Sequence, residues 1–91
     1  MEQQEVLELI KAERDRQDVK WGKNSHNPIE WYLIAQEEMG EINNGLLVGA
    51  DLNDIRREII QLAAVCVAWL EDDHPTPPAA GESESATNGK Q

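Results

Sequence analysis

Residues 59–70, IIQLAAVCVAWL, restrict the fold of this chain more than any other stretch. If the run is helical, its apolar side chains cover most of the helix circumference, and such a helix is buried on several sides. Its apolar part, residues 62–70, is roughly half as long as a membrane span requires, so a core helix is predicted. The other short helices of a 91-residue chain would leave part of this surface open. A second copy of the chain is expected to cover it.

Three helical segments are predicted, and no alternating strand pattern or internal repeat is found. The first spans roughly residues 2–18, where side chains recur at a spacing of three to four residues: Val6, Leu7, Leu9, Ile10 and Glu13. The second begins near Pro28, which suits the first turn of a helix, after Asn27 as a cap. It is expected to end around Gly49.

The third predicted helix follows the turn at residues 49–54. Asp51 or Asn53 provides its cap, and it extends to about Asp72. The residues expected to carry it into the core are Ile55, Ile59, Leu62, Cys66 and Trp69. The predicted fold is all-α, with three principal helices in an antiparallel bundle that homo-oligomerisation completes.

Two segments of different composition accompany the helices. Residues 19–28, VKWGKNSHNP, combine Gly, Asn, Ser and Pro and are predicted to form a loop that serves function. From His74 onward Pro, Gly, Ser and Thr dominate, and large apolar side chains are absent. Such a segment buries too little apolar surface to fold, so residues 73–91 are predicted to be a disordered tail. The helical domain is expected to span residues 1–72.

The charge of the chain limits its partners. Its formal charge is −10, from 18 acidic and 8 basic residues. Proteins that bind the phosphate backbone of nucleic acids normally carry a basic stripe, and this chain has none, so no nucleic acid polymer is expected as a partner. An anionic ligand would need a divalent cation between itself and the protein.

The expected location is the cytoplasm. The N-terminal residues lack the basic and apolar regions of a signal peptide, and no membrane partner is expected. The single cysteine, Cys66, has no partner for an internal disulfide, which fits a reducing compartment. Because Cys66 lies in the apolar run, it is predicted to be a core thiol rather than a reactive one.

Glutamates within AQEEMGEI (35–42) occupy different faces of the second predicted helix. At about 100° per residue, Trp31, Ala35 and Ile42 define the core direction of this helix. Glu38 falls inside this apolar stripe, Glu41 lies at its edge, and Glu37 points further toward solvent. Glu58 lies inside an apolar stripe of the third helix. Inward carboxylates are costly unless they are paired or bind a metal. Oxygen ligands favour hard cations such as Mg²⁺ or Mn²⁺, so a metal site is predicted. The alternative to a metal site is that these glutamates line a solvated seam or form an ion-pair network with Arg56 and Arg57.

These carboxylates also fit a known signature. Glu38-Met-Gly-Glu41, sixteen further residues, and Glu58-Ile-Ile-Gln61 resemble the ExxE…ExxD pattern of MazG-like, all-α nucleoside triphosphate pyrophosphohydrolases. Residues 13–22 and 58–71 look like the small phage- and prophage-type members of that family. The resemblance covers roughly residues 1–72. It implies helices that assemble into dimers or tetramers, and cleavage of a (d)NTP into the monophosphate and pyrophosphate with Mg²⁺ as cofactor.

The resemblance also implies roles for individual residues. Glu38, Glu41 and Glu58 would bind metal. On chemical grounds Glu37, beside these ligands, is expected to join Glu38 in the catalytic set by orienting or deprotonating the attacking water; the alternative is that Glu37 is an ordinary exposed residue. The position expected to hold Asp is Gln61, whose neutral amide binds a hard cation less strongly. Either the site works with fewer acids or Asp54, one turn before Glu58, completes it.

The loop would contact the nucleotide. Trp21 can stack on a base or anchor the loop to the core, and Lys20 can reach phosphates or remain an ordinary surface lysine. Asn24 can read a base edge or cap the loop. His26 is a further substrate-binding candidate whose alternative role is structural.

A function of another class fits the composition as well. A non-catalytic acidic helical protein from a mobile element, acting as a mimic of DNA charge or as a regulator, would also carry a charge of −10. Such a mimic should spread carboxylates over its outer surface, whereas an enzyme should gather several at an inner seam. The inward positions of Glu38 and Glu58 favour the enzyme.

Overall fold

The computed structural model of the chain describes residues 1–22 and 25–72. Within these ranges the chain forms three helices and no strand: α1 (Gln3–Trp21), α2 (Pro28–Leu47) and α3 (Leu52–Glu71). The prediction of an all-α fold is confirmed. Asn24 and the predicted tail, residues 73–91, lie outside the described residues.

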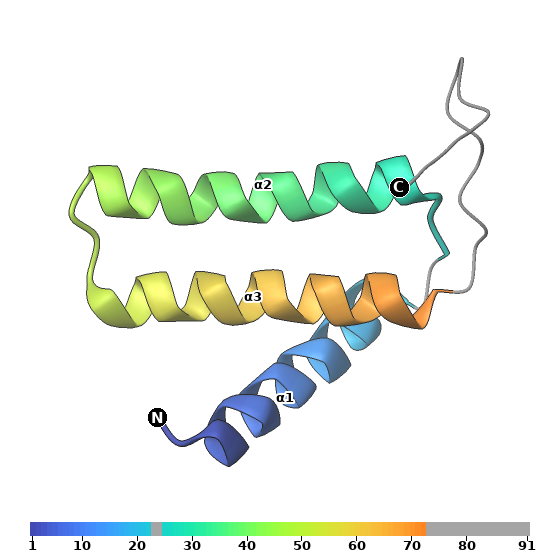
Figure 1. Cartoon of the computed structure of the whole chain (residues 1–91), viewed down its shortest axis with the longest axis horizontal. Coiled ribbons are helices and arrows are strands. Elements are labelled where there is room, and N and C mark those ends of the chain that lie inside the picture. Colours follow the sequence, from blue (N-terminus) through green and yellow to red (C-terminus); the bar gives the residue numbers. More distant parts are fainter. Residues whose placement is uncertain (23–24, 73–91) are drawn as a thin grey trace, which may run out of the picture.

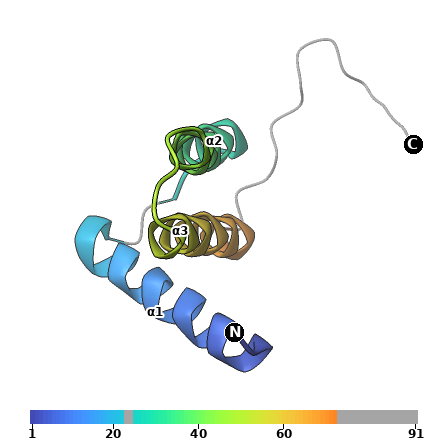
Figure 2. The same cartoon turned by 90° about the vertical axis from the view of Figure 1, so that its left-hand side faces the viewer.

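Helix α3 lies between the other two helices. α2 and α3 run side by side in opposite directions, and α1 crosses α3 obliquely on its other side (Figures 1 and 2). Helix packing joins α3 to α2 and α3 to α1, whereas none joins α1 to α2 in the described part of the chain. The helix with the broadest apolar surface is therefore the one that holds the chain together.

Side-chain caps set the start of two helices, as the sequence predicted. Asn27 begins α2 with a capping box: its side chain accepts a hydrogen bond from the Glu30 backbone N–H, and the Glu30 carboxylate accepts one from the Asn27 N–H, both at 2.9 Å. Asp51 begins α3 by accepting a hydrogen bond from the Asn53 N–H at 3.0 Å. Of the two cap candidates for α3, Asp51 is the one that acts.

The first helix is longer than predicted. Val19, Lys20 and Trp21, expected in a loop, form the last residues of α1. The helix stops at Gly22, which has a positive φ of 77° and donates its N–H to the Asp18 carbonyl at 2.8 Å. Glycine adopts this conformation without the steric cost that other residues meet. The helix therefore ends just before Gly22 and not before Val19, where the loop was predicted to begin.

A small core lies where α2 packs on α3. Trp31 of α2 and Val65 and Ala68 of α3 are buried together. The partly buried apolar side chains packed against them are Ile34, Ala35 and Trp69. Further along α2, Ile42 is also buried. The prediction that Trp31 and Ile42 lie on the inward face of this helix is therefore confirmed.

One face of α3 remains open in the single chain. Ile59 is 48% exposed, Leu70 is 84% exposed, and Cys66 is exposed as well. Their spacing of seven and four residues places all three along one line of the helix. The predictions that Ile59 and Cys66 lie in the core are therefore wrong for one chain, because α1 and α2 cover the sides of α3 that carry Ala64, Val65 and Ala68. Within the described ranges, no helix combines the length and apolar character needed to cross a membrane.

Asp72 ties the end of α3 to the start of α2. Its carboxylate accepts hydrogen bonds from the indole Nε1 of Trp31 at 2.8 Å, from the backbone N–H of His26 at 2.9 Å, and from the Ser25 hydroxyl at 3.0 Å. One side chain thus satisfies a buried indole and the residues that lead into α2. It fixes the position of Trp31 in the core.

Replacement of Asp72 is expected to destabilise the fold. Asp72→Ala leaves the Trp31 indole and the His26 N–H without this acceptor, and should lower the free energy of unfolding by about 2 kcal/mol. Urea denaturation followed by tryptophan fluorescence measures this change. Asp15→Ala, which removes an exposed ion pair with Lys11, is the control and should cost less than about 1 kcal/mol. Equal losses for the two variants would contradict a special role for Asp72.

Candidate functional site

Two glutamates meet between α2 and α3. Glu38 of α2 and Glu58 of α3 are both half-buried. The Gln61 amide donates to Glu58 Oε1 at 2.8 Å and to Glu38 Oε1 at 3.2 Å. This amide orientation follows from the neighbours, because the opposite one would set the amide oxygen against carboxylate oxygens. Glu38, Glu58 and Gln61 are named the carboxylate seam.

The surroundings of Glu38 oppose its ionisation. Burial is the largest cause that raises its pKa above the ordinary value of 4.5, and the nearby charge of Glu58 is the next. The other contributing charges are those of Glu37, Glu41 and Glu13. Burial and like charges both disfavour the carboxylate. A cation at this position would relieve the repulsion.

Helix α1 adds polar groups that the sequence analysis did not assign to the site. Gln17 is the buried residue of this helix, with 6% exposure. Its Nε2 donates to Glu13 Oε2 at 3.2 Å and to the backbone carbonyl of Gln61 at 3.5 Å. Arg16 donates to both Glu13 oxygens, at 2.8 and 2.7 Å, and hydrogen bonding from Arg16 lowers the pKa of Glu13. Gln17 could have been found from the helical spacing of Val6, Ile10, Glu13 and Gln17 in the sequence. This spacing indicates that the inward stripe of α1 continues from apolar to polar residues.

The remaining predicted metal ligands are more exposed. Glu41 is exposed, although its charge contributes to the raised pKa of Glu38. The side chain of Asp54 is 59% exposed and forms an ion pair with Arg57 at 2.8 Å. Asp54 is not among the charges that raise the pKa of Glu38. The structure thus brings together Glu38, Glu58 and Gln61, with Glu41 at the edge and Asp54 apart.

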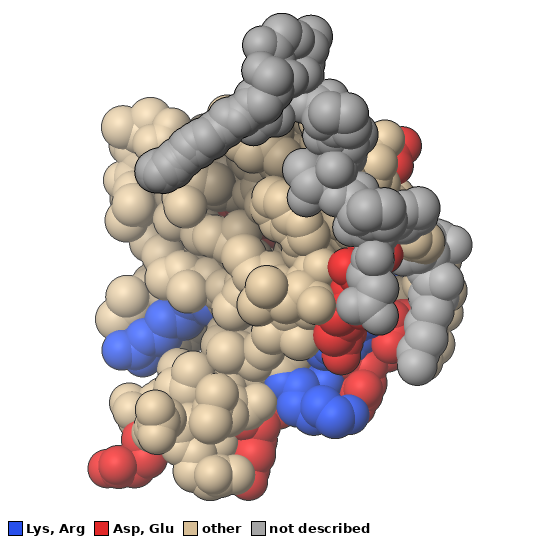
Figure 3. All heavy atoms as spheres, turned by 45° about the vertical axis from the view of Figure 1, so that its right-hand side comes forward, with Lys and Arg blue, Asp and Glu red and all other residues tan. Residues whose placement is uncertain are grey.

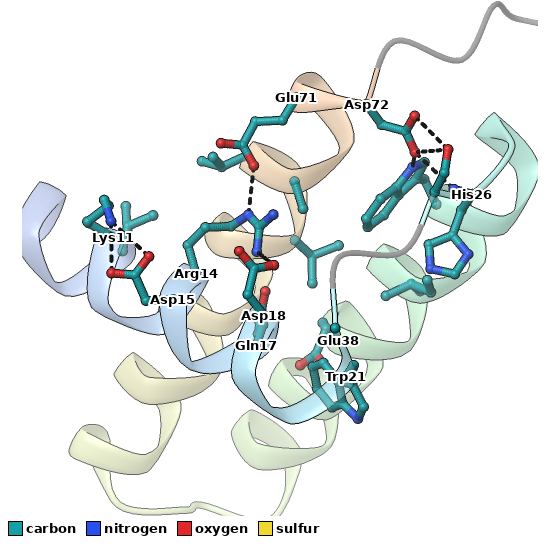
Figure 4. Close-up of a pocket in the computed structure, with 18 of the residues that line it drawn as sticks. Lys11, Arg14, Asp15, Gln17, Asp18, Trp21, His26, Glu38, Glu71 and Asp72 are labelled. Carbon is teal, nitrogen blue, oxygen red and sulfur yellow. Dashed lines mark hydrogen bonds and ion pairs between the residues drawn. The ribbon is translucent and has the colours of Figure 1, made fainter.

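A large pocket adjoins the seam. It has a volume of about 1190 Å³ and lies between α1, the N-terminal half of α2 and the C-terminal half of α3 (Figure 4). Among the predicted site residues, Trp21, His26, Glu37 and Glu38 line it. Trp31 lies in its wall as well. It is named the aromatic pocket.

Acidic side chains dominate the charge of the aromatic pocket. Its cations are already engaged: Lys11 pairs with Asp15, and Arg14 bridges Asp18 on its own helix and Glu71 of α3. The acidic side chains in the lining are Asp15, Asp18, Glu37, Glu38, Glu71 and Asp72. A polyphosphate would therefore enter this pocket together with cations.

The predicted nucleotide-binding residues occupy different positions. Trp21 is 53% exposed at the end of α1, and the Lys20 ammonium lies 4.9 Å from the centre of its ring. Lys20 itself is exposed and outside the pocket lining. His26 packs edge-on against Trp31, with ring centroids 4.8 Å apart, which fits its structural role. Asn24 lies outside the described residues.

The seam suits a hard divalent cation. Among the described residues, no group of three or more His, Cys, Asp or Glu side chains is arranged to hold a metal ion. Mg²⁺, however, is commonly bound by one or two carboxylates together with water and substrate phosphates. Glu38 and Glu58 supply two carboxylates, and rotation of the Gln61 amide would replace its N–H₂ group by an oxygen ligand.

Comparison with known protein families, curated proteins and solved structures finds no match for this chain. The resemblance to MazG-like enzymes remains a prediction from the motifs.

The raised pKa of Glu38 predicts how the stability of the metal-free protein varies with pH. Because the folded chain holds this proton more tightly than the unfolded chain, the free energy of unfolding should fall as pH rises from about 4.5 through the higher folded pKa. Glu13, whose pKa is lowered, acts below this window, where its stabilising effect is lost as pH falls.

Glu38→Gln should therefore unfold at a higher urea concentration than the parent at pH 7 in the presence of EDTA. Its free energy of unfolding should also vary less between pH 4.5 and 7. Urea denaturation across this range measures both effects, with the exposed Glu8→Gln as the control. Parallel pH profiles for the parent and Glu38→Gln would contradict the assignment.

Proposed function

We propose that this chain is a cytoplasmic, metal-dependent nucleoside triphosphate pyrophosphohydrolase that converts a (d)NTP to the monophosphate and pyrophosphate. The observation that carries the proposal is the carboxylate seam. Two glutamates from different helices are half-buried and share one amide donor, and one of them, Glu38, lines a pocket large enough for a nucleotide. A structural carboxylate pair would gain more from a basic partner than from a neutral amide.

The charge distribution supports an enzyme over an acidic mimic. Several carboxylates gather at the seam and in the aromatic pocket. On the face shown in Figure 3, uncharged side chains separate groups of acidic and basic side chains. A mimic of DNA charge requires a continuous acidic surface, which this face does not show. The pocket also provides an aromatic ring, Trp21, on which a base can stack.

The residues of the seam and pocket have separate tasks in the proposed reaction. A Mg²⁺ or Mn²⁺ ion would be held by the carboxylates of Glu38 and Glu58 and by the side-chain amide oxygen of Gln61. When bound, this ion neutralises phosphate charge and lowers the pKa of water. The water oxygen bonds to the α-phosphorus, and the bond from this phosphorus to the bridging oxygen breaks. The bridging oxygen leaves with pyrophosphate. Glu37, exposed in the pocket wall, accepts the proton of the attacking water.

We further propose that two or four copies of the chain assemble, which would complete the helical bundle. The support is the open apolar line of Ile59, Cys66 and Leu70 on α3. Further apolar side chains are exposed around the α2–α3 turn: Leu46, Leu47, Val48 and Leu52. Apolar surface on this scale in so small a chain is typical of a subunit contact.

Incubation with each (d)NTP and Mg²⁺ or Mn²⁺ should yield the monophosphate and pyrophosphate in equal amounts. Glu38→Gln should lower kcat/KM by at least about 100-fold, because it removes the charge of a seam carboxylate and leaves the side-chain shape. The control, Glu8→Gln, alters an exposed glutamate of α1 and should retain parent activity. Absence of turnover with every nucleotide and both metals would refute the enzyme. Full activity in Glu38→Gln would refute the site.

Assembly should depend on the open line of α3. Ile59→Glu/Leu70→Glu places two charges on this line and should shift the protein from oligomer to single chain, as sedimentation velocity would show. Val19→Glu, at a residue that is 87% exposed on α1, adds a charge at another apolar surface position and should leave the assembly intact. A parent protein that sediments as a single chain would contradict the proposal.

A further inference from the structure

A second groove is lined by Glu13, whose charge acts on Glu38 of the seam. Its volume is about 550 Å³, and it lies between the N-terminal part of α1 and the first half of α3. The lining residues that matter are Glu13, Arg16, Arg56, Arg57 and Ile60. It is named the arginine groove.

The groove concentrates positive charge in an acidic chain. Three of the four arginines of the sequence line it. Arg16 is held by Glu13 and Arg57 by Asp54, whereas Arg56 is exposed and, within the described residues, has no hydrogen bond or ion pair. The acidic side chains in the lining are Glu5 and Glu13. The planar guanidinium group binds two phosphate oxygens at once, so the groove suits a phosphate-rich anion.

The seam is linked both to this groove and to the aromatic pocket. Glu13 lines the groove and Glu38 lines the pocket. The charge of Glu13 acts on Glu38, and the charge of Glu38 acts on Arg16. Gln17 bonds to Glu13 and to the backbone of Gln61, which connects the groove wall to the seam. A substrate whose reacting phosphate lies at the seam would therefore have the aromatic pocket next to Glu38 and the arginine groove next to Glu13.

We propose that the arginine groove binds the β- and γ-phosphates of the substrate and the pyrophosphate that leaves, while the nucleoside and its α-phosphate occupy the aromatic pocket. The proposal rests on the proposed pyrophosphohydrolase function and adds the direction in which the substrate lies. Pyrophosphate carries more negative charge than the monophosphate, so it belongs on the side where guanidinium groups gather. The monophosphate belongs where its base can stack on Trp21.

Calorimetric titration of the full chain with inorganic pyrophosphate and Mg²⁺ tests this placement. The parent should bind pyrophosphate, and Arg56→Gln/Arg57→Gln should bind it at least about tenfold more weakly, because two guanidinium donors are lost. The affinity for each deoxynucleoside monophosphate should change less than about twofold. Both arginines are exposed, so the variant should keep the parent's helical content by circular dichroism. Lys11→Gln is a control for lost charge, since it lies in the wall of the other pocket, and should leave pyrophosphate affinity within about twofold of the parent.

The outcomes separate this inference from the proposed function. Equal pyrophosphate affinity in the parent and the double variant, or no binding by the parent, would overturn the placement even if the enzyme turns over triphosphates. Arginine-dependent pyrophosphate binding without turnover would refute the proposed function and leave the groove as an anion site. Loss of assembly in the double variant with unchanged pyrophosphate binding would assign the groove to a subunit contact and overturn the inference.

Discussion

The packing of two helices on opposite sides of α3 is the constraint on which the rest of the structure depends. α1 and α2 each bury part of this helix and, within the described ranges, do not pack on each other. The space between them is therefore bordered by α3 and lined by side chains from all three helices, and it forms the aromatic pocket. Asp72 stabilises the arrangement at one end by holding Trp31 and the backbone before α2. A closed bundle of the same three helices would fill this space with its own core.

The carboxylates lie where this packing makes them costly. Glu38 and Glu58 share the side of the hairpin that α1 approaches, so burial and mutual repulsion act together on Glu38. The Gln61 amide reduces that repulsion with hydrogen bonds to both acids. A carboxylate at position 61 would add a third charge, whereas the amide stabilises the metal-free state and can still offer oxygen to a cation. The departure from the expected acid is thus compatible with a metal site of lower charge.

The sequence predicted features that depend on local chemistry and helical periodicity. Asn27 and Asp51 act as caps through residues two or three positions away, and the inward direction of Trp31, Glu38 and Ile42 follows from spacing alone. Features that depend on distant segments were missed. Nothing near Asp72 in the sequence indicates that its partners lie at Ser25, His26 and Trp31. Cys66 was expected inside because periodicity cannot tell which side of an apolar helix remains open in one chain.

Gln17 shows how a residue missed by motif analysis can organise a site. As the buried residue of α1, it uses one amide to reach both Glu13 and the backbone of Gln61. Burying an amide is costly unless its hydrogen bonds are made, so the bond to the Gln61 backbone favours one rotation of α1 against α3. The same rotation places Glu13 and Arg16 beside the seam and Trp21 in the wall of the aromatic pocket. The polar contact that fixes the first helix therefore also determines which charges and which aromatic ring surround Glu38.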